Sequence, residues 1–206
     1  MPLHTFDRYI SLPVLAILLV LAGCGTTPPA RFYTLEAMPQ PAEKPGIPEG
    51  STNLHIGIGP VQFAEYLDRT QIVTRSGSTE VNLSESHRWA EPLQANFTRI
   101  LAENLSVLLN TDRVSLHPSR NWSEVDYQVL VNVWQFDVSK QGHANLVANW
   151  SIRGKGGADL ITMQKTVLST SVDPEASYAE SARALSKTVE MLSHVIADAV
   201  SKNRQN

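Results

Sequence analysis

The sequence predicts an α+β fold, in which one mostly antiparallel sheet is covered by two long helices and preceded by a flexible tether. Two observations carry this prediction. Three long segments in the C-terminal half alternate apolar and polar residues and are joined by short connections, which is typical of an antiparallel meander. Two other segments repeat apolar residues every three or four positions, which indicates amphipathic helices. In such a fold the helices and the sheet bury their apolar faces against each other.

The first strands are expected soon after residue 52. Residues 54–58 alternate, and Pro60 is expected to end this strand because it lacks a backbone N–H. Residues 71–75 and 79–83 flank Ser76-Gly77-Ser78, and this pattern predicts a hairpin.

The first helix is expected over residues 89–109, with Pro92 in its first turn, where the missing N–H is tolerated. Its apolar face consists of Leu93, Phe97, Ile100, Leu101, Leu105 and Leu108. Four more strands are expected at 113–117, 126–138, 143–153 and 160–172, with a Gly-rich turn at 154–157.

The last helix is expected directly after Asp173 and Pro174, a capping side chain followed by proline at the first helical position. Its apolar seam consists of Tyr178, Ala182, Leu185, Val189, Leu192, Ile196 and Ala199. Packing of this seam against the sheet is favoured over a coiled coil with another chain.

The first 23 residues have the features of a secretory signal. A polar start containing Arg8 precedes an apolar run from residue 10 to 22, which is short for a membrane span. The run ends in Leu21-Ala22-Gly23-Cys24, which resembles the lipobox of bacterial lipoproteins. In that class the thiol receives a diacylglycerol, the chain is cut before the Cys, and the new amine is acylated. We therefore expect residues 1–23 to be a signal peptide and Cys24 to carry the lipid anchor. An ordinary signal peptide or an uncleaved membrane anchor is the alternative.

The residues after Cys24 predict both the membrane in which the protein is located and the segment that links its anchor to the domain. In Gram-negative lipoproteins an Asp at the next position commonly retains the protein in the inner membrane, so Gly25 favours the inner (periplasmic) leaflet of the outer membrane. Six of the twelve prolines lie between residues 25 and 50, which predicts an extended tether over 24–51. Within it, residues 31–35 are suited to a short strand. Residues 52–206 are expected to form a single α+β domain.

Composition and motifs argue against several functions. The net charge of −3 is unlike that of a nucleic-acid-binding protein. Cys24 is the only cysteine, so no intrachain disulfide can form. The six histidines are scattered without metal-ligand spacing, and there is no nucleophile elbow, phosphate loop or dinucleotide fingerprint. We therefore expect no catalysis, no metal and no cofactor.

Two segments are candidates for a contact surface. The first, residues 62–71, is expected to be a loop between strands, with Tyr66 and Leu67 as anchors and Arg69 as a polar clamp. Alternatively, Tyr66 and Leu67 fold back onto the core while Asp68 and Arg69 stay solvated. The second segment is 88–93. There Trp89 is expected to staple the helix start to the sheet, and Arg88 to form an exposed pair with Glu91.

These segments together resemble the PqiC-type lipoproteins, also called the ABC-type transport auxiliary lipoprotein component family. The resemblance rests on Phe32-Tyr33-Thr34-Leu35, on Ile58-Gly59-Pro60-Val61 leading into the run from Glu65 to Arg75, and on Arg88-Trp89-Ala90-Glu91-Pro92-Leu93. A softer likeness follows in residues 127–137, 146–152 and 184–186.

The resemblance implies a non-catalytic lipoprotein of an intermembrane lipid transport system. In such systems an MCE-domain protein forms a tunnel across the periplasm, and the lipoprotein receives its far end at the outer membrane. Family members can assemble into homo-oligomeric rings. Carried onto this chain, the candidate partner or assembly surface is Tyr66, Leu67, Asp68, Arg69, Arg75, Arg88 and Trp89. The alternative function is a lipid-binding carrier that holds a phospholipid acyl chain between the sheet and the helices.

Overall fold

The computed structural model describes residues 29–40, 53–119 and 122–204, so the expected signal peptide and Cys24 lie outside the described residues. The two long helices are α2 (Leu93–Leu109) and α3 (Tyr178–Arg204). Three short 3-10 helices are η1 (Glu65–Leu67), η2 (Trp122–Glu124) and η3 (Lys155–Gly157). The strands are β1 (Arg31–Tyr33), β2 (Ile56–Phe63), β3 (Gln71–Arg75), β4 (Val81–Trp89), β5 (Val114–Leu116), β6 (Tyr127–Ser139), β7 (His143–Gly154) and β8 (Asp159–Ser171).

The sheet is mixed, so the prediction of a mostly antiparallel sheet is wrong. Four pairs of neighbouring strands are parallel, namely β1–β4, β2–β5, β2–β6 and β3–β6. Three are antiparallel, namely β3–β4, β6–β7 and β7–β8. Only the antiparallel neighbours are joined by short turns. The parallel neighbours meet through long connections, three of which contain α2. Alternation of apolar residues carries no information on strand direction.

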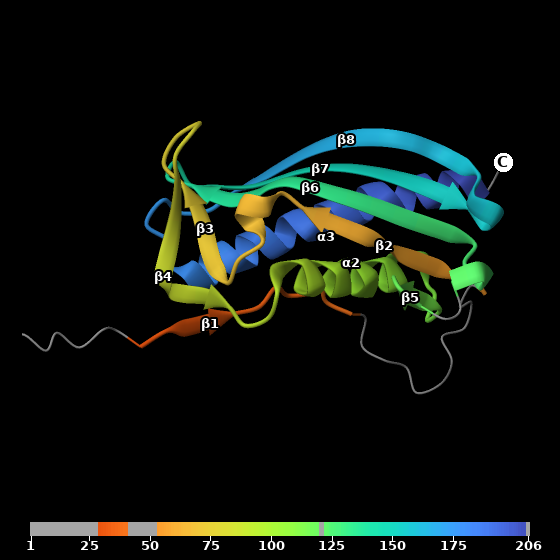
Figure 1. Ribbon diagram of the computed structural model, residues 1–206, viewed down its shortest axis with the longest axis horizontal. Coiled ribbons are helices and arrows are strands. Elements are labelled where there is room, and N and C mark those ends of the chain that lie inside the picture. Colours follow the sequence, from red (N-terminus) through yellow and green to blue (C-terminus); the bar gives the residue numbers. More distant parts are fainter. Residues whose placement is uncertain (1–28, 41–52, 120–121, 205–206) are drawn as a thin grey trace, which may run out of the picture.

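Strand β6 is the centre of the sheet. Strand β7 pairs with its whole length along one edge, whereas β2 and then β3 share its other edge. The long strands β6, β7 and β8 arch over α3, and α2 lies beside α3 (Figure 1). The seam of α3 packs against β6, β7, β8 and α2, which is the favoured prediction for this helix. The layer between sheet and helices is filled by side chains such as the edge-to-face rings of Phe63, Phe97 and Phe136.

A β-bulge interrupts the alternation of β6. Val133 faces Ala148 and Gln135 faces Val147 on the neighbouring strand, so Trp134 is the extra residue. Before the bulge the odd-numbered valines face the core, and after it Phe136 and Val138 do. The bulge therefore returns Phe136 and Val138 to the core face, while Trp134 lies on the opposite face with 57% of its surface exposed.

Both helices begin later than the sequence predicts. Strand β4 continues to Trp89, and α2 starts only after its N-cap, Pro92. Helix α3 starts at Tyr178, because Ser177 and Glu180 form the capping box. The Ser177 N–H donates to the Glu180 carboxylate over 2.8 Å, and the Glu180 N–H donates to Ser177 Oγ over 3.3 Å. Asp173 instead accepts the Glu175 N–H (2.8 Å) and so caps a turn upstream of the helix.

Strand β2 also differs from its prediction, because it continues through Pro60 to Phe63. The register with β6 shifts between Ile58 and Val61. Proline fits there because a break in the ladder needs no N–H donor from it.

The described part of the expected tether lies on the domain. The short strand foreseen within 31–35 forms as β1 and pairs in parallel with β4. Leu35 is buried in the core. The backbone N–H groups of Glu36 and Met38 donate to Ser186 Oγ (3.0 Å) and Asn104 Oδ1 (2.8 Å), so this segment runs along both helices.

Candidate functional site

The segment after β2 packs both Tyr66 and Leu67 against the core, but to different depths. Leu67 is buried in the core, as the structural alternative for this loop expected. Tyr66 is half-buried, and its hydroxyl donates to the Trp134 carbonyl over 3.2 Å. The same hydroxyl accepts a hydrogen bond from Arg75 Nη2 over 3.4 Å. The loop thus brings Tyr66 against the bulge of β6.

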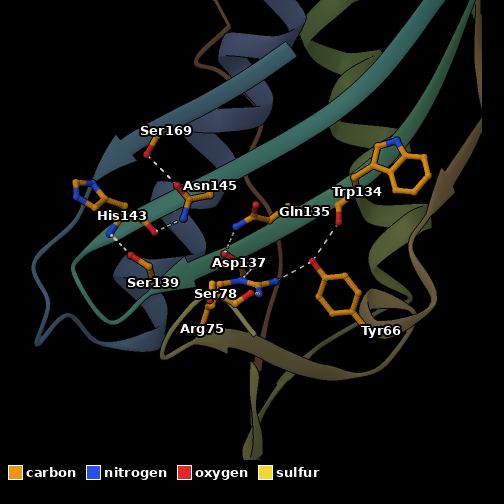
Figure 2. A network of polar contacts seen from close by, with 10 residues as sticks. All are labelled: Tyr66, Arg75, Ser78, Trp134, Gln135, Asp137, Ser139, His143, Asn145 and Ser169. Atoms are coloured by element: carbon orange, nitrogen blue, oxygen red, sulfur yellow. Dashed lines mark hydrogen bonds and ion pairs between the residues drawn. The ribbon is translucent and has the colours of Figure 1, made fainter. Parts of the chain in front are cut away.

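Arg75 joins Tyr66 to a buried carboxylate, as Figure 2 shows. Its Nε lies 2.9 Å from Asp137 Oδ2, and its Nη1 donates to the Ser78 carbonyl over 3.1 Å. The Asp137 side chain is 0% exposed and that of Arg75 is 20% exposed. Gln135 Nε2 donates to the second carboxylate oxygen over 3.0 Å. The Asp137 charge is therefore paired and hydrogen-bonded on both oxygens.

The electrostatics of this network hold it in one charge state. Burial alone would lower the pKa of Arg75, but the hydrogen bond and the charge of Asp137 outweigh it, so that the pKa is raised. Burial, and after it the Asp137 charge, raises the pKa of Tyr66. The site at neutral pH therefore contains a fixed cation and a neutral phenol.

Trp134 is the functional candidate that sequence reasoning missed. The spacing of three between the core residues Val133 and Phe136 is the signal for its bulge, because an uninterrupted strand would place core residues two apart. In Figure 2 only the carbonyl of Trp134 takes part in the network, and the indole lies outside it. Arg75, Tyr66 and Trp134 thus form a half-exposed cluster, which we name the Tyr66 patch.

The remaining loop residues are less tightly held. Asp68 is exposed and Arg69 is half-buried. The Arg69 Nε is shielded from solvent and has no hydrogen-bond partner among the described residues.

The second candidate segment, residues 88–93, contributes Trp89 to the core and Arg88 to a surface away from the Tyr66 patch. Trp89 is buried, and its backbone N–H donates to the Thr70 carbonyl over 2.7 Å, which ties the end of the loop to β4. Arg88 Nε donates to the Glu85 carbonyl (3.0 Å). The expected Arg88–Glu91 pair does not form, because Glu91 instead bonds Arg99 over 2.8 Å. Arg88 faces the first residue of β3, whereas Arg75 is the last, so the two arginines lie at opposite ends of that strand.

The described residues contain neither a metal-binding cluster nor a membrane-spanning helix. Within residues 29–40, 53–119 and 122–204, no three His, Cys, Asp or Glu side chains are grouped to hold a metal ion. In the same ranges no helix combines the length and apolar character that crossing a bilayer requires. One open hollow of about 410 Å³ lies at the C-terminal end of α3, beside Arg204, and another of about 390 Å³ lies along the C-terminal half of that helix. Trp150, Ile161 and Val195 contribute to the wall of the second hollow.

Comparison with known proteins identifies the family. The family model described as ABC-type transport auxiliary lipoprotein component matches residues 33–197. The chain belongs to this family. It is therefore an auxiliary lipoprotein of a transport system, anchored in the cell envelope. No curated protein is significantly similar to it.

Two solved structures share the fold of this auxiliary lipoprotein. One is the crystal structure of an uncharacterized protein, with a TM-score of 0.67 and 18% identity over 84% of this chain and 99% of that one. The other is protein XCC0632 from Xanthomonas campestris, of the family DUF330. It has a TM-score of 0.66 and 13% identity over 85% of this chain and 100% of that one. At these identities the likeness concerns the fold alone.

Proposed function

We propose that this auxiliary lipoprotein is a non-catalytic outer-membrane subunit of an MCE-type intermembrane lipid transport system. It docks onto or caps the far end of the periplasm-spanning MCE-domain protein and so supports envelope integrity. The observation that carries the proposal is the family match over residues 33–197, in a chain whose N-terminus contains the lipobox Leu21-Ala22-Gly23-Cys24.

In this proposal Cys24 is the lipid anchor and Gly25 permits export to the inner leaflet of the outer membrane. Each buried methylene of an acyl chain contributes about 0.8 kcal/mol, and two or more chains anchor a protein stably. The domain then acts from a fixed place in the envelope.

The proposed contact surface is the Tyr66 patch together with Asp68 and Arg69. Tryptophan, tyrosine and arginine are the residues that most often dominate binding energy at protein interfaces. Here the ion pair with Asp137 holds Arg75 in place before binding, which lowers the entropy lost on association. Leu67 and Trp89 support this surface from the core, and Arg88 of β4 lies beside the other end of β3.

Co-purification tests the partner directly. The full-length protein is isolated from membranes in mild detergent, and proteins and lipids in the eluate are identified by mass spectrometry. Trp134→Ala removes the exposed indole, and Val167→Ala on β8 is the matched control, since Val167 is 65% exposed and lies outside the patch. We expect an MCE-domain protein with wild type and with Val167→Ala, and a strong loss of it with Trp134→Ala.

An eluate that contains no MCE-domain protein would contradict the proposal. A lipoprotein without an MCE-domain protein but with bound phospholipid would favour the carrier. The native mass of the eluate also gives the number of copies, which tests the homo-oligomeric ring.

A further inference from the structure

The chain between the expected lipid anchor and the domain is short. Residues 31–38 are docked on β4, α2 and α3, so only residues 25–30 separate Cys24 from β1. A fully extended chain spans at most 3.6 Å per residue, which limits the distance from Cys24 to Arg31 to about 25 Å. The 27 residues of α3 make the domain about 40 Å long at 1.5 Å per residue. The anchor therefore cannot reach from one end of the domain to the other.

Strand β1 lies at the end of the domain where α3 begins. The ring of Tyr33 lies 6.4 Å from that of Tyr178, the first residue of α3. His87 of β4 stacks on Tyr178 at 4.0 Å and shares a 2.8 Å hydrogen bond with the Tyr33 hydroxyl. Figure 1 shows β1 and β4 at one end of the molecule and the C-terminal end of α3 at the other. An anchor on Cys24 thus holds the β1 end against the bilayer.

That end exposes an aromatic side chain, with one arginine before it in β1 and another opposite it in β4. Phe32 is 64% exposed, unlike its neighbour Tyr33, which packs against the core. Arg31 is exposed, and Arg88 faces Phe32 across the parallel pair β1–β4. Glu85 lies 3.5 Å from one Arg88 nitrogen and offsets part of its charge. Exposed aromatic residues flanked by arginine suit the boundary between lipid headgroups and acyl chains, where phosphates accept hydrogen bonds from guanidinium groups.

We propose that Phe32, flanked by Arg31 and Arg88, is a second membrane contact that inserts into the headgroup region of the phospholipid surface holding the anchor. This inference rests on the proposed acylation of Cys24. The contact fixes the orientation of the domain: the β1 end faces the bilayer, and β5, η2 and the C-terminal end of α3 face away from it. The domain therefore contacts the membrane surface at its β1 end and is not held away from it by a long tether.

A fluorescent probe at position 32 tests this contact in the lipidated, full-length protein. Cys24 is the only natural cysteine, so after acylation Phe32→Cys carries the only free thiol. It is labelled with a thiol-reactive NBD dye and reconstituted in vesicles of phosphatidylethanolamine and phosphatidylglycerol. Ala158→Cys is the control, because Ala158 is exposed and lines the same hollow as Arg204 at the far end of α3. Ala30→Cys, also exposed, is a second probe beside Phe32.

We expect a lipid-borne doxyl quencher to abolish most of the emission at positions 32 and 30 and to leave position 158 unchanged. If the doxyl lipid quenched the emission equally at all three positions in acylated protein, this result would overturn the membrane contact and leave the anchor intact. A probe at 32 that is shielded from aqueous dithionite but not quenched by the doxyl lipid would mean that protein covers Phe32, which also overturns it. Protein whose mass shows no acylation would overturn the anchor itself, and this inference with it.

Discussion

Arg75 matters at the scale of single residues because it neutralises a carboxylate that has no access to water. Asp137 is buried, and Arg75 is its ion-pair partner at 2.9 Å. We expect Arg75→Ala to lower the free energy of unfolding by about 3 kcal/mol, since an unpaired buried charge is left behind. Urea denaturation followed by circular dichroism measures this.

The control for this variant is Arg153→Ala. Arg153 pairs with Asp159 at 3.1 Å, but both side chains are largely exposed, so the loss should stay below about 1 kcal/mol. Equal losses in the two variants would show that the Asp137 pair is no stronger than a surface pair.

Arg69 offers the converse test, because its contribution is expected in binding rather than folding. Arg69→Glu reverses a charge next to the Tyr66 patch and should weaken co-purification of the partner with little change in melting temperature. The opposite pattern, a large fall in melting temperature with association intact, would mean that the loop is purely structural.

At the scale of elements, β1 and the residues after it behave as part of the domain. Leu35 is buried, whereas Phe32, three residues earlier, is exposed. We expect Leu35→Ala to lower the free energy of unfolding by about 3 kcal/mol. Phe32→Ala is the matched control and should change it by less than about 0.5 kcal/mol. If Leu35→Ala were as mild as Phe32→Ala, residues 31–38 would lie on the domain without stabilising it.

The capping box of α3 makes part of the stability dependent on pH. Hydrogen bonds from Ser177 hold the pKa of Glu180 below its usual value of 4.5. A carboxyl whose pKa is lower in the folded state stabilises the fold above its unfolded pKa and loses this effect as pH falls through the folded value. Wild type should therefore be more stable than Glu180→Gln at pH 7, and this difference should vanish well below pH 4.5. A difference that persists unchanged at pH 3 would show that the charge is not its source.

The types of the helices and strands were more predictable from the sequence than the residues at which they begin and end. The long alternating strands and both amphipathic helices form where their periodicity places them, because one apolar face must be buried. Helix starts were displaced because the Trp89 side chain suits a strand as well as a helix, and because Asp173 caps a turn before Ser177 caps the helix. Of the candidate site, Tyr66 and Arg75 were also candidates from the sequence. Asp137 and Trp134 were not, since they join it only through contacts of β6 with Arg75 and Tyr66, which lie in separate elements.

At the scale of the whole molecule, topology was the part that sequence patterns could not settle. Both parallel and antiparallel neighbours use the same alternating residues, so the direction of β2 and β3 relative to β6 follows only from tertiary pairing. This pairing brings Tyr66, Arg75 and Trp134 together from three separate elements. The same topology places β1 at one end of the molecule, which is why the proposed anchor and the proposed Phe32 contact share that end.

The central claim is that the Tyr66 patch contacts an MCE-domain protein in the intact envelope. Its most direct test is a photocrosslinking amino acid at position 134, activated in living cells, with position 167 on β8 as the control. We expect a crosslink to an MCE-domain protein from position 134 and none from 167. Crosslinks from position 134 to lipid alone, or to copies of this chain alone, would contradict the claim.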